Sequence, residues 1–157
     1  MNKLNLVSFL FFSLVVSNCL SFAQTPQQEK YIEWFTGAIS ELGPVSKEMI
    51  ERIEKHTNNP SALQVLKNKV DSLYAVWRIT KHPAPFHKTD MFFGKALRYY
   101  SLAIEKGRVW IDEIDPDIRD QKGREYVSAL SIMNMYVSSC LEEFKIESAQ
   151  ISGGKIP

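Results

Sequence analysis

Residues 25–53 read TPQQEKYIEWFTGAISELGPVSKEMIERI, and the spacing of their apolar side chains is that of an amphipathic α-helix. Apart from one step of seven, these side chains recur every three or four residues: Ile32, Phe35, Ile39, Leu42, Met49 and Ile53. Thr25 and Pro26 suit the cap and the first turn of such a helix. The segment therefore predicts a helix that begins at Pro26 and buries one face.

Gly43 and Pro44 interrupt this pattern, because proline lacks the N–H of a helical hydrogen bond and its ring crowds the preceding turn. The apolar phase nevertheless continues across them, since Ser46 takes the missing position between Leu42 and Met49. We therefore expect one long first helix that is kinked at Gly43-Pro44, not two unrelated helices.

Three further segments, at about residues 60–80, 90–114 and 116–151, show the same helical spacing. The prolines in residues 81–85 predict an extended connection between the first two of them. Four amphipathic helices with short connections predict an all-α, up-down-up-down antiparallel four-helix bundle. Its expected core includes Leu66, Val70, Trp77, Leu97, Tyr100, Leu130, Met133 and Val137.

The N-terminus has the features of a secretory signal peptide. Lys3 supplies a positive charge, an uncharged apolar segment follows, and Ser21-Phe22-Ala23 places small residues at the −3 and −1 positions of a cleavage site. The hydrophobic central part of this segment is shorter than the roughly 20 residues that span a bilayer. We therefore expect residues 1–23 to be removed, which leaves residues 24–157 as one exported, extracytoplasmic bundle domain with a flexible C-terminal tail. The alternatives are a lipoprotein modified at Cys19 and an uncleaved anchor.

The charges of the expected mature domain are balanced. The whole chain has 19 basic and 18 acidic side chains, and the leader contains one of the basic ones, Lys3. Binding to nucleic acid requires a surplus of Lys and Arg, and so does attachment to a membrane surface through a basic face. We therefore expect neither. Cys140 is the one cysteine left in the mature domain, so no intramolecular disulfide is expected.

His82, His87 and Asp90 are the residues whose chemistry suggests a metal site, since two imidazoles and a carboxylate could hold a divalent ion beside a water molecule. Their spacing matches no established ligand pattern, and a proline-containing loop does not hold them on one face. The alternative is a solvated loop whose histidines titrate near neutral pH, with Asp90 favoured in the first turn of the third helix.

Other cofactor and catalytic motifs are absent from the sequence. Covalent haem attachment needs Cys-x-x-Cys-His, which does not occur, and His56 and Met133 are better explained as a helix-end residue and a core residue. The acids between Asp112 and Asp120 lack the spacing and the central glycine of a calcium loop. No nucleophile elbow, phosphate loop or dinucleotide fingerprint occurs. We therefore expect no cofactor and no enzymatic activity.

Phe92, Tyr99 and Trp110 fall on one line along the third helix, because successive helical residues lie about 100° apart. This line lies about 100° from the core meridian. Either a neighbouring helix covers the three rings, or they form an exposed strip for a protein partner or a second copy of the chain. The function expected from the sequence is thus non-catalytic binding of an unidentified partner. The alternative is a carrier of a small ligand or metal, in the bundle core or at the His82/His87 loop.

Overall fold

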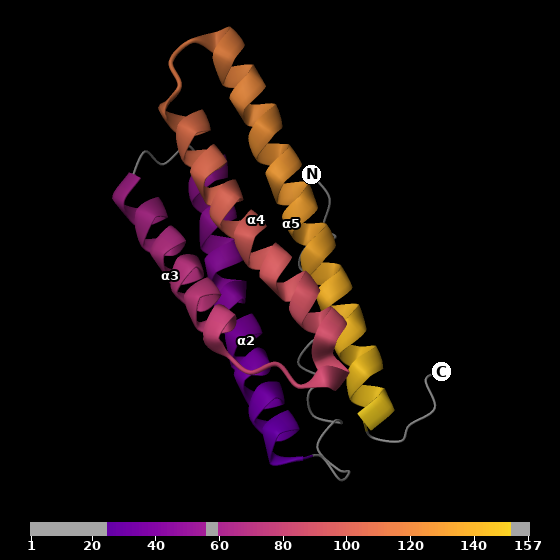
Figure 1. The fold of residues 1–157 in the computed structure, drawn as a ribbon. Helices are drawn as coiled ribbons and strands as arrows, with labels where there is room; N and C mark the ends of the chain where they lie inside the picture. The colour runs from indigo at the N-terminus through magenta and orange to yellow at the C-terminus, as the bar shows by residue number, and fades with distance from the viewer. Residues whose placement is uncertain (1–24, 56–59, 152–157) are drawn as a thin grey trace.

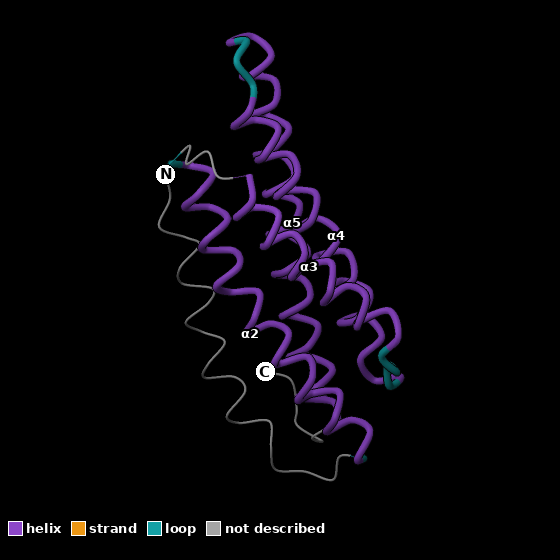
Figure 2. Tube along the Cα trace, turned by 90° about the vertical axis from the view of Figure 1, so that its left-hand side faces the viewer, coloured by secondary structure: helices purple, strands orange, loops and turns teal. Residues whose placement is uncertain are grey.

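Four α-helices make up the part of the chain that the computed structural model describes, residues 25–55 and 60–151. They are α2 (Pro26–Glu54), α3 (Pro60–Ile79), α4 (His87–Asp112) and α5 (Pro116–Ile151), with a short 3-10 helix, η1 (Ala84–Phe86), before α4. Figure 1 shows α4 between α3 and α5, with the chain direction alternating from each helix to the next. In Figure 2, turned by 90°, α2 lies to one side of the other three helices. The prediction of an all-α antiparallel four-helix bundle is confirmed.

The first of these helices, α2, runs without a break through Pro44. At its start, Thr25 and Gln28 form a capping box. The Thr25 backbone N–H donates to Gln28 Oε1 at 2.8 Å, and the Gln28 N–H donates to the Thr25 hydroxyl oxygen at 3.3 Å. Leu42 and Val45, on either side of the proline, are both buried, so packing supports the turn in which one backbone hydrogen bond is missing. The expectation of one helix across Pro44 is confirmed.

The core between the helices is rich in aromatic rings. The ring centroid of Phe35, on α2, lies 4.5 Å from that of Phe144 on α5 and 5.2 Å from that of Phe93 on α4. Five residues of the expected core are buried: Leu66, Val70, Leu97, Tyr100 and Met133. The other three, Trp77, Leu130 and Val137, are only partly buried against it. These three therefore lie at the edge of the core, not at its centre.

The connections differ from the expectation in two details. Residues 84–86 form η1 instead of an extended link, and this turn places Phe86, 0% exposed, in the core. At the other end, α4 stops at Asp112, so Ile114 lies beyond it and is 91% exposed. Glu113 explains this end, because its carboxylate accepts the N–H groups of Ile114 and Asp115 and so turns the chain out of the helix.

Several predictions concern residues outside the described ranges. The signal peptide, Cys19, His56 and the C-terminal tail all lie there. Among the helices of residues 25–55 and 60–151, none combines the length and apolar character needed to cross a membrane.

Candidate functional site

A buried carboxylate lies at the start of α4, where α2 and the α3–α4 connection meet this helix. Asp90, in the first turn of α4, is 6% exposed. The hydroxyl of Tyr31, on α2, donates a hydrogen bond of 2.6 Å to Asp90 Oδ1. The Nδ1 atom of His82, in the connection, lies 2.6 Å from Asp90 Oδ2. A negative charge is favourable in the first turn of a helix, and these two contacts tie α2 and the connection to α4.

The surroundings of Asp90 decide which of these groups hold protons. Burial raises the pKa of Asp90 above its usual value, although the hydrogen bond from Tyr31 and the charge of His82 act in the opposite direction. Burial, and then the charge of Asp90, raise the pKa of Tyr31 far above that of an ordinary phenol. Tyr31 therefore keeps its proton at physiological pH and acts as a hydrogen-bond donor.

His82 is enclosed by aromatic rings. Its ring centroid lies 5.7 Å from that of Trp77, 6.1 Å from that of Tyr31 and 6.4 Å from that of Trp34. Its Nε2 lies 2.9 Å from the backbone oxygen of Trp77, in the last turn of α3. Both ring nitrogens are thus close to an oxygen, and only the protonated imidazole can donate from both at once. The side chain is 27% exposed, so protons from solvent can reach it.

A second buried carboxylate caps α4 from another helix. Glu147, on α5, accepts hydrogen bonds from the backbone N–H groups of Lys88 at 3.0 Å and Thr89 at 3.1 Å, and from the Thr89 hydroxyl at 2.6 Å. The first N–H groups of a helix have no partner within it, and the helix dipole favours a negative charge there. This tertiary cap explains why α4 begins at His87, earlier than the start near Asp90 that the sequence predicts.

Cys140 lies beside this cap and is 0% exposed. Its Sγ donates to the backbone oxygen of Thr89 at 3.4 Å. Burial, with the negative charges of Asp90 and Glu147, raises the pKa of the Cys140 thiol well above its ordinary value. Cys140 is therefore a protonated core residue, as expected from its apolar neighbours on the helix.

The metal site suggested by His82, His87 and Asp90 is not assembled. His82 and Asp90 are in contact, whereas His87 is exposed at the first position of α4. Within residues 25–55 and 60–151, no three His, Cys, Asp or Glu side chains are grouped as they would be around a metal ion. The third side chain at the His82–Asp90 pair is Tyr31, a phenol that keeps its proton. The pair is thus a contact between parts of the bundle.

A second feature lies between α4 and α5, and we call it the aromatic seam: Phe92 and Tyr99 of α4 with Tyr136 of α5. The Tyr136 ring centroid lies 5.5 Å from that of Tyr99 and 6.3 Å from that of Phe92. Lys95 Nζ lies 5.4 Å from the centroid of Tyr136 and 5.8 Å from that of Phe92, within range of a cation–π interaction. All three rings are only partly buried. The helix α5 therefore covers this flank in part and leaves some ring surface exposed.

Trp110, the third residue of the expected strip, packs on a different ring of α5 from the one that the seam residues contact. Its ring stacks on that of Tyr126, with the centroids 5.5 Å apart and the planes at 21°. An added Cβ at Gly123 would lie 3.1 Å from Trp110 Nε1, so the indole packs directly on the backbone of α5. Earlier on α4, Lys106 pairs with Glu125 at 2.7 Å. The strip is therefore divided into the seam and a separate tryptophan contact.

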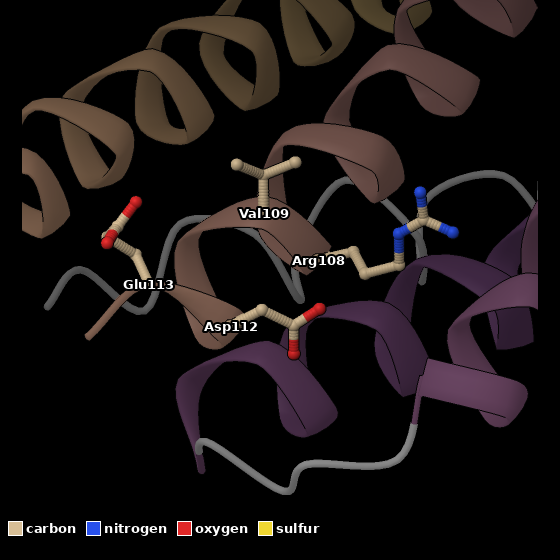
Figure 3. Close-up of a pocket in the computed structure, with 4 residues that line it drawn as sticks. All are labelled: Arg108, Val109, Asp112 and Glu113. Carbon is tan, nitrogen blue, oxygen red and sulfur yellow. The ribbon is translucent and has the colours of Figure 1, made fainter.

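An open hollow of about 350 Å³ lies at the C-terminal end of α4, lined by Arg108, Val109, Asp112 and Glu113. All four residues come from one short segment, and Figure 3 shows Arg108 and Glu113 pointing in opposite directions. Small-molecule sites are usually concave and apolar, with a few polar groups that converge on the ligand. The hollow lacks that convergence, so it is a weaker candidate than the aromatic seam.

The sequence pattern identified the α4 residues of these features but not their partners on other helices. Tyr31, Glu147 and Tyr136 lie far along the chain from the α4 residues that they contact. The position of one of them, Glu147, could have been recognised from the sequence. Glu147 follows Phe144 by three residues, on the core face of α5, and a charged residue on a core face is rarely buried without a partner.

No family model, curated protein or solved structure matches this chain. Two features of the chain itself bear on its function. These are the polar cluster at the start of α4 and the aromatic seam between α4 and α5.

Proposed function

We propose that the protein is an exported, non-catalytic helical bundle that binds a protein partner through the aromatic seam. The observation that carries this proposal is that Phe92, Tyr99 and Tyr136 form one cluster whose rings stay partly exposed, with the cation of Lys95 beside them. Aromatic residues are enriched in the cores of protein interfaces. The partner is either another protein or a second copy of this chain.

The polar cluster supports a structural role over a catalytic one. Both nitrogens of His82 lie close to oxygens, so neither is directed at a site for substrate. A nucleophile is activated by a lowered pKa or by an adjacent base, whereas the pKa values of Tyr31 and Cys140 are both raised. These groups are instead used in contacts that join the helices.

Export is supported by the N-terminal sequence together with the start of the fold. Residues 1–23 combine a charged start, an apolar segment and small residues at the cleavage site. The capping box that begins α2 is built on Thr25 and Gln28, just beyond this site, so cleavage leaves it intact. N-terminal sequencing of the protein from its own cells is expected to start at Gln24. A lipid-modified Cys19 or a retained Met1 would contradict that site.

Photo-crosslinking in the full-length protein tests the binding surface. A benzoylphenylalanine placed at Tyr99 is expected to give one discrete adduct of higher mass in the native cells, and mass spectrometry then identifies the partner or a second copy. The same residue placed at Val65, which is 54% exposed on α3, is the matched control and is expected to give no such adduct. Equal labelling from both positions, or no adduct from Tyr99, would contradict the proposal.

Affinity for the identified partner provides the second test. Lys95→Glu removes the cation beside the seam rings and is expected to weaken binding about tenfold, since cation–π contacts that become desolvated contribute up to about 2 kcal/mol. Lys69→Glu makes the same charge change at an exposed position of α3 and should leave binding unchanged. Both lysines are exposed, so neither variant should unfold the protein. An equal effect of the two variants would exclude the seam as the binding surface.

A further inference from the structure

One side chain, His82, joins three parts of the bundle at a single point. Its ring lies among Tyr31 and Trp34 of α2 and Trp77 of α3, and its two nitrogens face Asp90 Oδ2 and the Trp77 backbone oxygen. The chain enters this point from α3 and leaves it through η1 toward α4. The α3–α4 connection is therefore held to the rest of the bundle through one imidazole.

The charge of the His82 imidazole decides how favourable its contacts with Asp90 and the Trp77 backbone oxygen are. Protonated, His82 has an N–H on each ring nitrogen and places a cation 2.6 Å from the buried carboxylate of Asp90. Neutral, it has one N–H, so one of its two nitrogens turns a lone pair toward an oxygen. Asp90 then keeps a buried negative charge without a cation, which is the costly arrangement for a buried pair.

We propose that His82 is a proton-operated latch: its protonated ring fastens the α3–α4 connection to Asp90 and α2, and loss of the proton loosens this end of the bundle. The device is independent of the proposed partner. It responds to a change of pH and needs no ligand.

Four other titratable groups lie at or near this point: Asp90, Tyr31, Cys140 and Glu147. Burial raises the pKa of Asp90, so the ionised carboxylate that the latch uses is present only above that raised pKa. Tyr31 and Cys140 have raised pKa values and keep their protons throughout. Glu147, on α5, is held by the N–H groups at the start of α4. The latch is therefore fastened where Asp90 is ionised and His82 is protonated, and a further rise in pH opens it by removing the proton of His82.

Hydrogen exchange in the full chain measures the opening of the latch. Amides of residues 77–90 are expected to exchange about tenfold faster at pH 8 than at pH 5.5, after division by the chemical exchange rate at each pH, because a buried carboxylate that has lost its cation is costly. His82→Asn should remove this difference. His87→Asn is the matched control, since His87 is a nearby exposed histidine, and it should behave like the wild type.

Three results would overturn the proposal. They are a wild-type protein whose exchange ratio is the same at both pH values, a His82→Asn variant that keeps the wild-type difference, and a difference that disappears when a metal chelator is added. Should His82→Asn not fold, Asp90→Asn carries the test. Its amide oxygen still accepts from Tyr31 but has no charge, so the pH difference should again be lost, and its persistence would refute the latch.

Discussion

Replacing Gly94 by alanine should destabilise the protein, although alanine is the better helix former. Gly94 lies inside α4 at the point where the indole of Trp77, from α3, packs on its backbone. A Cβ at this position would lie 2.5 Å from the Cη2 and Cζ2 atoms of Trp77, too close for any real contact. The indole is not free to move aside, because its ring stacks on Tyr74 at 5.4 Å and lies 5.7 Å from His82.

Two opposing effects set the change in unfolding free energy that Gly94→Ala causes. Alanine in place of glycine in a helix gains about 0.8–1.0 kcal/mol, whereas an extra carbon forced into packed surroundings costs about 1–3 kcal/mol. Gly37, exposed on α2, is the matched control because nothing lies within 4 Å of a Cβ added there. Gly37→Ala therefore shows the first effect alone. The difference in unfolding free energy between the two variants isolates the packing cost and should be about 1–3 kcal/mol.

Urea unfolding followed by circular dichroism gives the free energies. Gly37→Ala should be more stable than the wild type, and Gly94→Ala less stable. Trp77→Leu identifies the cause, since in that background Gly94→Ala should gain the helix benefit and become stabilising. A Gly94→Ala variant as stabilised as Gly37→Ala, or an effect of Gly94→Ala that is unchanged in the Trp77→Leu background, would contradict a clash between the added Cβ and the Trp77 indole.

Three other predictions follow from burial and capping. Leu97→Ala, at a fully buried position, should lower the unfolding free energy by about 2–5 kcal/mol. Leu130→Ala, at the edge of the core, should lower it clearly less in the same urea assay. Equal losses of unfolding free energy would place Leu130 in the centre of the core. Glu147→Ala should lower the unfolding free energy by about 1–3 kcal/mol, because it leaves the N–H groups of Lys88 and Thr89 unpaired. Glu147→Gln keeps an acceptor oxygen and should recover part of that loss, so identical unfolding of the two variants would speak against the cap. Cys140 should resist iodoacetamide at pH 8 in the folded protein and react once urea unfolds it, since burial raises the pKa of its thiol; rapid labelling of the native state would show that the site is open.

The helical spacing of apolar residues was enough to predict the fold class, because periodicity and capping are local properties of the chain. Thr25 caps α2 as expected, and Asp115 accepts the N–H groups of Asp117 and Ile118 at the start of α5. The continuous phase across Pro44 correctly predicted one helix. The start of α4 could not be predicted in this way, because its cap, Glu147, comes from another helix.

The candidate sites depend on how the helices are rotated and placed against one another. A helical pattern tells which face of α4 carries Asp90 or Tyr99, but not which residue of α2 or α5 lies opposite. That pairing follows from the packing of all the side chains between the helices, such as the indole of Trp77 seated on Gly94. This packing brings Tyr31 to Asp90 and Tyr136 to Tyr99. The local sequence therefore determined the helices and the α4 residues of each site, whereas the residues that contact them from α2 and α5 were decided by the tertiary structure.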